Sequence, residues 1–342
     1  MDILDRKLLN LLQWEFPLVP RPFQVLAEKL ETTEDDILSR SRRLKAEAKI
    51  IRQISAIFDT RSLGYQSSLV AMRVDPSRVE EAAAVVNTHP GVSHNYKRDH
   101  PFNLWFTIAV PPQSSLEHTV DRLHQLAKAE STRILPTLRL FKIGVRLDMT
   151  GQEDNTAPTD QAYSEEVRQG AMKHPLTSFE IQAIRELQED LPLEPYPFKS
   201  MADRLGLDDE GLLAIAQALQ ERGQMRRFAA VLHHRQAGFR ANAMGVWKVP
   251  EDRAAEVGPF MGSFRGVSHC YLRPVYPDWP YNIFTMIHGQ KAKDCQAVIE
   301  KIAETTGITD YAVLYSTKEY KKTRVRYFTE VLDAWEKRYL ET

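Results

Sequence analysis

The chain contains two copies of one sequence pattern, and this internal repeat constrains its fold more than any other feature. Gly91-Val92-Ser93-His94 returns unchanged as Gly266-Val267-Ser268-His269. Each histidine is followed at the second and fourth positions by a tyrosine and an arginine, namely Tyr96 with Arg98 and Tyr271 with Arg273. The offset between the copies increases from Pro101 and Pro280 onward, because the second copy has a longer loop. The repeat indicates a duplication with halves at about residues 1–150 and 174–342.

Each half predicts the same order of secondary structure. Apolar residues at helical spacing predict helices at 2–16 and 23–30 and from Thr33 onward, followed by a strand at 50–58. This combination is typical of a winged helix-turn-helix. The next residues predict strand, helix, two paired strands, helix and a last strand at 134–147, the βαββαβ order of a ferredoxin-like domain. The predicted fold class is therefore α+β, a tandem duplication of a winged helix-turn-helix joined to a ferredoxin-like βαββαβ domain.

The repeat also predicts domain boundaries. The first winged helix is expected at residues 1–60 and the first ferredoxin-like domain at 61–150. Residues 151–173 are rich in polar residues, Gly and Pro with little apolar periodicity, which predicts a surface linker. The second winged helix is expected at 174–235 and the second ferredoxin-like domain at 236–342.

Composition argues against several classes of protein. The two cysteines, Cys270 and Cys295, are too few for a disulfide framework or a thiolate zinc site. No apolar run approaches about 18 residues, and no secretory signal pattern opens the chain, so neither a membrane partner nor export is expected and the predicted location is the cytoplasm. The 45 basic and 46 acidic residues give a net charge of -1, so no global field attracts nucleic acid.

The architecture resembles the AsnC/Lrp family of transcription regulators. The residues that carry this likeness are Leu8-Leu9-Asn10-Leu11-Leu12-Gln13, Arg40-Ser41-Arg42-Arg43-Leu44-Lys45 and Leu63-Gly64-Tyr65. In that family two chains associate through their sheet domains. The resemblance therefore implies a pseudodimer within this one polypeptide, and it leaves a further homodimer open.

A DNA-binding regulator that responds to a small ligand is the alternative function. It requires basic recognition helices, because cations that meet phosphates supply most of the affinity for DNA. The first copy offers Arg40, Arg42, Arg43 and Lys45, although this charge pattern is more typical of a solvated helix face. The second copy offers 207–220, a segment that begins with acidic residues and contains no Lys or Arg. DNA is therefore not the expected partner.

The repeated His-x-Tyr-x-Arg segment is the strongest candidate for chemistry. Side chains two apart on a strand share a face, so His94, Tyr96 and Arg98 are expected to project together. The same holds for the second set, His269, Tyr271 and Arg273. Each set combines an imidazole that can ligate iron or donate a proton, an aromatic wall and a cation suited to carboxylates. The alternative is that the histidines serve only the fold and that the repetition is a relic of duplication.

Two further groups are candidates for ligand binding. Arg52 and Arg227 occupy the same repeat position on the wing strands, next to Arg226, where they would face an anionic substrate, flank DNA or protect a strand edge. The longer loop of the second copy carries Trp279 and Tyr281, which form either a pocket wall or a small loop core. The sequence has no P-loop, no dinucleotide glycine fingerprint and no Gly-x-Ser-x-Gly elbow.

At these residues the chain resembles the siroheme decarboxylases, as a fusion of their two subunits. The second half resembles the second subunit through Met225-Arg226-Arg227-Phe228, Trp247-Lys248-Val249-Pro250, Tyr276-Pro277-Asp278-Trp279-Pro280-Tyr281-Asn282 and Phe284-Thr285-Met286-Ile287-His288-Gly289. The first half resembles the first subunit through Gly91-Val92-Ser93-His94-Asn95-Tyr96 and Phe102-Asn103-Leu104-Trp105-Phe106-Thr107. One departure is Gln53, where related first subunits often have a second arginine after Arg52.

The resemblance implies a carboxy-lyase that removes two acetate carboxylates from siroheme and gives 12,18-didecarboxysiroheme, in a route to haem or haem d1. Siroheme, an iron tetrapyrrole, is the implied substrate, and no further cofactor is expected because its conjugated ring can accept electrons. The expected catalytic residues are His94, His269, Tyr96 and Tyr271, with both histidines as proton donors or axial ligands to the substrate iron. The expected substrate-binding residues are Arg52, Arg98, Arg226, Arg227, Arg273, Trp279 and Tyr281. The richer loop of the second copy favours a working site around His269.

Overall fold

The computed structural model describes residues 1–144, 148–150, 163–233, 236 and 241–340. The chain divides into two compact units, and each unit takes segments from both halves of the repeat. Residues 1–63, 145–154 and 166–240 form the winged-helix unit, and residues 64–144, 155–165 and 241–342 form the sheet unit. The duplicated modules are therefore sorted by type, because both winged helices belong to one unit and both ferredoxin-like domains to the other.

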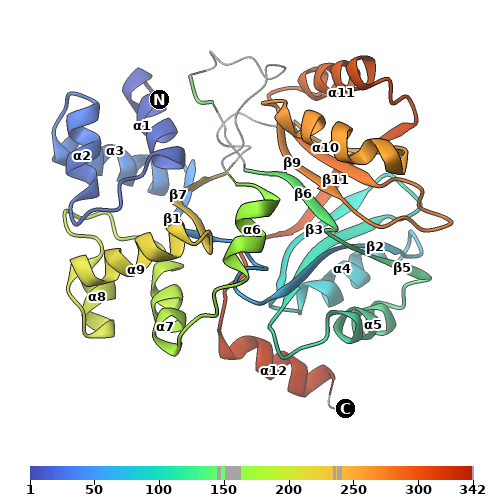
Figure 1. Cartoon of the computed structure of the whole chain (residues 1–342), viewed down its shortest axis with the longest axis horizontal. Helices are drawn as coiled ribbons and strands as arrows, with labels where there is room; N and C mark the ends of the chain where they lie inside the picture. The colour runs from blue at the N-terminus through green and yellow to red at the C-terminus, as the bar shows by residue number, and fades with distance from the viewer. Residues whose placement is uncertain (145–147, 151–162, 234–235, 237–240, 341–342) are drawn as a thin grey trace. The chain divides into compact units, whose positions relative to one another are not determined.

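The winged-helix unit repeats a set of three helices and a strand (Figure 1). The first copy has α1 (Ile3–Trp14), α2 (Pro22–Lys29), α3 (Glu34–Ala46) and β1 (Ile51–Phe58), and the second has α7 (Ser178–Leu187), α8 (Lys199–Leu205), α9 (Asp209–Glu221) and β7 (Met225–Leu232). Side-chain oxygens of Asp2, Thr33, Thr177 and Asp208 accept hydrogen bonds from backbone amides in the first turns of α1, α3, α7 and α9. The predicted helices of the first copy are present.

Strands β1 and β7 pair as an antiparallel ribbon that joins the two winged helices. Aromatic side chains from both copies pack around this ribbon. The ring of Phe228 lies 5.3 Å from that of Phe16 and 5.4 Å from that of Phe198, measured between centroids. The two winged helices therefore share one apolar core.

Part of the predicted linker forms a helix. Residues 151–162 lie outside the described residues, but Glu165–Ala171 forms α6. Arg168 on this helix is buried and forms an ion pair with buried Asp59, with 2.8 Å between Nη2 and Oδ2. The sequence analysis missed α6, because a helix of two turns has too few residues to establish a periodic pattern.

The sheet unit contains the two ferredoxin-like domains (Figure 1). The first consists of β2 (Gln66–Arg73), α4 (Val79–Asn87), β3 (Val92–Arg98), β4 (Leu104–Val110), α5 (Leu116–Ala127), β5 (Ser131–Pro136) and β6 (Arg139–Ile143). The second consists of β8 (Ala241–Trp247), η1 (Glu251–Arg253), α10 (Ala254–Ser263), β9 (Val267–Leu272), β10 (Ile283–Gly289), α11 (Ala292–Thr306) and β11 (Tyr311–Lys322), followed by α12 (Glu330–Tyr339). The predicted α+β fold class is confirmed.

The last strand of each copy also pairs with the other copy. In the described residues the strand order is β5-β2-β4-β3-β11-β8-β10-β9-β6. The first part of β11 pairs with β8 of its own copy, and Ser316–Lys322 pairs with β3 of the other copy. In the same way β5 pairs with β2 of its own copy, whereas β6 pairs with β9. We call residues 316–326 and 139–144 the exchange arms. The sequence predicted one strand at 134–147, of which 145–147 lie outside the described residues, and did not predict the exchange.

Three clusters of buried apolar residues form the core of the sheet unit. Helices α4 and α5 cover one face of the first copy's strands, and α10 and α11 cover one face of the second copy's strands. The third cluster draws residues from the opposite faces of both sets of strands. It consists of Ala71, Phe102, Trp105, Leu135, Met244, Val246, Trp279, Phe284 and Leu314. This inter-copy core explains why the two copies form one unit.

Each exchange arm carries a lysine, buried at Lys142 and half-buried at Lys321, that binds carbonyl groups at the end of a helix. Lys142 Nζ donates to Phe264 O at 2.7 Å, and Phe264 follows the last residue of α10. Lys321 Nζ donates to the carbonyls of Asn87 and His89, at 3.1 and 3.2 Å, at the end of α4. The ammonium groups meet the negative ends of the helix dipoles. Burial lowers the pKa of Lys142 to about 8 and also lowers the pKa of Lys321.

We predict that Lys142→Met reduces the pH dependence of stability in the alkaline range. Between pH 8 and 10.5 the unfolded chain retains the Lys142 proton that the folded chain has released. The free energy of unfolding of the wild type therefore includes a contribution that rises with pH across this window, and the variant lacks it. Urea unfolding over this range measures the effect, with Lys293→Met on the exposed surface of α11 as control. Equal slopes for wild type and Lys142→Met would contradict the prediction.

Candidate active site

The structure places each His-x-Tyr-x-Arg set on one face of its strand, as predicted. On β3 the ring centroids of His94 and Tyr96 lie 6.1 Å apart, and Arg98 Cζ lies 5.9 Å from the Tyr96 centroid. The intervening Asn95 points the other way and donates from its amide to Ala83 O of α4. On β9 the corresponding distances are 5.9 Å between His269 and Tyr271, and 4.7 Å from Arg273 Cζ to the Tyr271 ring.

The two sets lie on strands that are not neighbours, because β11, β8 and β10 lie between β3 and β9 in the strand order. We therefore describe each set as a candidate site of its own.

The arginine of each set is buried against the other copy. Arg98 and Arg273 are 4% and 8% exposed. Nη1 of Arg98 donates to Leu314 O of β11 at 2.8 Å, and Nη1 of Arg273 donates to Leu135 O of β5. Burial lowers the pKa of Arg98 to about 10, so its guanidinium stays protonated at neutral pH. The arginines join the copies and stack beside the tyrosines, and the substrate-binding role expected of them stays a prediction.

A serine and an exchange arm orient each histidine. Ser93 Oγ lies 3.0 Å from His94 Nδ1, and Ser268 Oγ lies 2.9 Å from His269 Nδ1, within hydrogen-bond distance in both cases. The carbonyl of each serine accepts a hydrogen bond from the other copy's arm, since Thr323 N donates to Ser93 O at 2.7 Å and Gly144 N donates to Ser268 O at 2.9 Å. The position of each imidazole is thus set by both copies.

The surroundings of the two histidines differ in charge. Lys322 of β11 lies opposite His94, whereas Ile143 of β6 lies opposite His269. His288 on β10 is close enough to Lys322 for the ammonium charge to affect it. Burial, with a smaller contribution from this charge, lowers the pKa of His288 to about 4, so His288 is neutral at neutral pH. In the register that aligns Pro101 with Pro280, the first copy has Ala109 in place of His288.

Sequence reasoning missed Lys322 and His288 as candidate site residues. The signal that could have found Lys322 is the basic run Lys321-Lys322-Thr323-Arg324-Val325-Arg326, which contains four cations where the corresponding residues 142–147 of the first copy contain two, Lys142 and Arg146. His288 gave a weaker signal, because it lies in an otherwise apolar strand sequence and only the fold brings it near Lys322.

Trp279 belongs to the inter-copy core. Its side chain is 1% exposed, and its ring centroid lies 5.1 Å from that of Trp105 and 5.3 Å from that of Tyr281. Arg133 fixes the loop through a two-pronged contact with the carboxylate of Asp278, at 2.9 and 2.7 Å. This is the arrangement that a loop core predicts. A role for Trp279 or Tyr281 as a wall of the substrate pocket stays a prediction.

The wing arginines do not form one cluster. Arg227 lies opposite Ile57, five residues along β1 from Arg52, which places Arg52 and Arg227 about 17 Å apart along the antiparallel ribbon. Arg227 Cζ lies 3.9 Å from the ring centroid of Trp14, a cation–π contact. A substrate role for Arg52, Arg226 and Arg227 stays a prediction.

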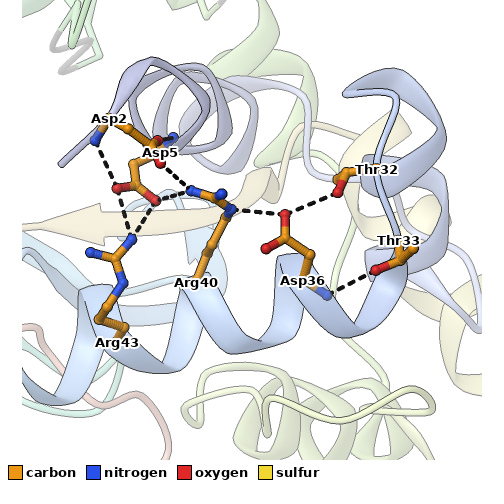
Figure 2. Close-up of polar contacts among 7 residues, drawn as sticks. All are labelled: Asp2, Asp5, Thr32, Thr33, Asp36, Arg40 and Arg43. Atoms are coloured by element: carbon orange, nitrogen blue, oxygen red, sulfur yellow. Dashed lines mark hydrogen bonds and ion pairs between the residues drawn. The ribbon is translucent and has the colours of Figure 1, made fainter.

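The basic residues of α3 are engaged by groups of the winged-helix unit itself. Figure 2 shows Arg40 between three carboxylates, with its Nη1 2.7 Å from Asp2 and 2.9 Å from Asp5 and its Nε 2.8 Å from Asp36. Arg43 Nη2 lies 2.7 Å from the same Asp5. The hydrogen bond from Arg40 is the largest cause that lowers the pKa of Asp2 to about 2. Burial acts to raise the pKa of Asp5, but hydrogen bonds from Arg43 and Arg40 keep it below its ordinary value.

The remaining cations of α3 are also occupied. Arg42 Nη2 donates to Leu193 O at 2.7 Å, and Lys45 Nζ lies 2.6 Å from Asp190 Oδ2. The equivalent helix α9 has Asp209 and Glu210 in its first turn and no basic residue in its last turn. The charges that the regulator alternative needs for phosphates are therefore used inside the fold.

We predict that the protein does not bind duplex DNA in a salt-dependent manner. Carboxylates and a backbone carbonyl already engage the cations that would release counterions from DNA. Fluorescence anisotropy with a labelled duplex at low ionic strength measures this, with an AsnC/Lrp regulator on its own operator as the positive control. An affinity that falls steeply with increasing salt would support the regulator alternative.

No group of three or more His, Cys, Asp or Glu side chains is arranged to hold a metal ion in the described part of the chain. No described helix is both long enough and apolar enough to cross a membrane.

Comparison with known proteins places both modules in described families. A family model for an AsnC-like ligand binding domain matches residues 62–142 and 236–321. A family model for the HTH domain of NirDL-like siroheme decarboxylases matches residues 5–52 and 180–226. Each model matches twice, once in each half of the repeat.

Relatives of similar length match almost the whole chain. The siroheme decarboxylase of Hydrogenobacter thermophilus is 42% identical over 330 residues, which cover 96% of each chain. A crystal structure of the siroheme decarboxylase NirDL is 38% identical with a TM-score of 0.75, and the match covers 99% of this chain and 98% of that one. A second crystal structure of NirDL, in complex with an iron-uroporphyrin III analogue, is also 38% identical, with a TM-score of 0.73 and 98% of each chain covered.

Proposed function

The chain belongs to the siroheme decarboxylase family, and we propose that it converts siroheme into 12,18-didecarboxysiroheme by removing the carboxyl groups of two acetate side chains. The observation that carries this proposal is the match to a siroheme decarboxylase over 96% of both chains, so the relative has counterparts of both copies of the repeat. The NirDL complex with an iron-uroporphyrin III analogue supports an iron tetrapyrrole as the substrate class. The product would enter a route to haem or haem d1.

The reaction needs a proton but no net oxidant or reductant. In each step the bond between the acetate methylene carbon and the carboxylate carbon breaks, and carbon dioxide leaves. The electron pair left on the methylene carbon delocalises into the conjugated macrocycle. A proton added to that carbon then gives a methyl group. Because the substrate itself supplies the electron sink, we propose that the enzyme uses no cofactor beyond the iron tetrapyrrole that it acts on.

The protein then has three tasks, which are to bind the other carboxylates, to exclude water from the reacting one and to deliver the proton. Within the sheet unit, His94 and His269 are the proposed proton donors or axial ligands to the substrate iron. Tyr96 and Tyr271 complete these two sets. Five arginines remain proposed carboxylate-binding residues, and they are Arg52, Arg98, Arg226, Arg227 and Arg273.

We propose the site around His94 as the working site. The sequence favoured His269 because the second copy has the richer loop, but Trp279 of that loop packs into the inter-copy core. At His94 the other copy supplies Lys322, which is near enough to His288 for its charge to affect that imidazole. At His269 the residue opposite is Ile143, and the repeat counterpart of His288 is Ala109; neither side chain carries a charge or a hydrogen-bonding group. A substrate rich in carboxylates is matched by the charge of Lys322 opposite His94 and not by the apolar Ile143 opposite His269.

The direct test of the proposed activity is anaerobic incubation of the purified protein with siroheme. We expect a product that has lost two carboxyl groups, detected by mass spectrometry, while protein denatured by heat leaves siroheme unchanged. Unchanged siroheme in the presence of folded protein would contradict the proposed function.

A second prediction separates the two histidines. We expect His94→Ala to lower kcat by at least about 100-fold, because a positioned proton donor commonly contributes this much, and we expect His269→Ala to lower it by less than tenfold. Single-turnover kinetics measure the chemical step, and the absorption spectrum of bound siroheme reports on the iron ligand. A large fall in kcat in His269→Ala alone would place the working site in the second copy. Full turnover and an unaltered spectrum in both variants would remove both proposed roles.

A further inference from the structure

The C-terminal end of the second copy's exchange arm carries three cations at alternate positions. Lys322 is the last residue of β11, and Arg324 and Arg326 follow it without helix or turn. We propose that Lys322, Arg324 and Arg326, which we call the cationic row, bind the carboxylates of the tetrapyrrole substrate at His94. This proposal rests on the proposed function and deepens it, because it assigns substrate recognition at the first copy's histidine to residues of the second copy.

Backbone pairing fixes where the cationic row begins. Lys322 lies directly opposite His94 in the antiparallel pairing of β11 with β3. Residues opposite each other in such a pair share a face of the sheet, with Cβ atoms about 5 Å apart. Thr323 N donates to Ser93 O at 2.7 Å, so the pairing continues one residue beyond the strand. The ammonium group of Lys322 is therefore on the same face as the imidazole of His94.

The segment that carries the two arginines is anchored at its other end as well. Phe328 N donates to Tyr65 Oη at 2.6 Å, and the ring of Tyr327 packs against that of Tyr65, with 5.1 Å between centroids. A chain held at 323 and at 328 has little freedom in between. Arg324 and Arg326 lie at the second and fourth positions after Lys322, in residues that are neither helix nor turn, and we include them in the row that Lys322 begins.

The neighbouring lysine shows that the row is distinct from the structural part of the arm. Lys321 projects to the opposite face, where its Nζ donates to the carbonyls of Asn87 and His89 at the end of α4. Two adjacent lysines thus have different tasks. Lys321 holds the helix that leads into β3, while Lys322 faces the histidine at the start of β3.

The repeat supplies an internal comparison. In the register that aligns Pro101 with Pro280, the cationic row corresponds to Ile143, Val145 and Leu147. The pattern Lys-x-Arg-x-Arg in one copy is thus replaced by three apolar residues in the other. Duplication began from one sequence, so the two arms have diverged at the positions of the row. Lys322 opposite one histidine and Ile143 opposite the other fit a single site for a polycarboxylate.

The chemistry of the row matches that of the substrate. Arginine presents paired N–H groups that bind a carboxylate in two places, and lysine provides a compact charge. The sequence between Lys321 and Thr329 contains no acidic residue. The row is suited to the propionate and acetate groups along one edge of the tetrapyrrole.

The test uses binding as well as turnover. The variant is the full chain with Lys322→Met, Arg324→Gln and Arg326→Gln, and the probe is iron-uroporphyrin III, which carries carboxylates on every pyrrole ring. We expect the Kd of the probe, measured by absorbance titration, to rise by at least about 30-fold, and the KM for siroheme to rise more than kcat falls. Lys322→Met alone is the second variant, should the triple variant fold poorly, and its Kd should rise by about fivefold, with partial recovery in Lys322→Arg.

The control is Lys318→Met on the same arm. Lys318 is exposed and pairs with Glu80. Its substitution removes one positive charge, as Lys322→Met does, but away from His94, and should change the Kd of the probe by less than about twofold. A triple or single variant that binds the probe as tightly as the wild type would overturn the proposed role of the cationic row in substrate binding. It would leave the decarboxylase proposal intact. A wild type that binds the probe through the row but leaves siroheme unchanged would overturn the proposed function and not the row.

Discussion

The pairing of each copy's exchange arm with the other copy's histidine strand is the interaction on which the rest of the sheet unit depends. Strand β3 has β4 on one side, and only the arm of the second copy satisfies its other edge. Without that arm the strand would present unpaired amide and carbonyl groups. Because β6 does the same for β9, neither copy completes its own histidine strand. A fused chain supplies both arms in equal number and at a high effective concentration.

The exchange makes the backbone symmetric while leaving the side chains free to diverge. The hydrogen bonds from Thr323 to Ser93 and from Gly144 to Ser268 involve only main-chain atoms, so they survive almost any substitution. Side chains that project from the arm are under no such constraint. Lys322 at one histidine and Ile143 at the other therefore sit on equivalent backbone. One half of a duplicated scaffold can acquire a polar site while the other half keeps its structural role.

The winged-helix unit shows the same separation of fold from function. Its helices retain the order of a DNA-binding domain, but Arg40 and Arg43 of α3 are tied to carboxylates of α1, with Asp5 buried between them. An arginine that neutralises a buried carboxylate cannot leave it without exposing that charge to a medium of low polarity. These cations therefore stabilise the contact between α1 and α3.

The sequence by itself determined the duplication, the helices of the first copy and the common face of His94, Tyr96 and Arg98, because helical spacing and strand alternation depend only on residues close together in the chain. It also carried the family resemblance. Only the tertiary structure decided that β11 crosses to β3, that Trp279 enters the core and that Arg98 binds the carbonyl of Leu314. These contacts join residues from different copies of the repeat, and their register depends on how two sheets pack against each other. Local spacing carries no information about that packing, which is why Lys322 was found beside His94 only in the fold.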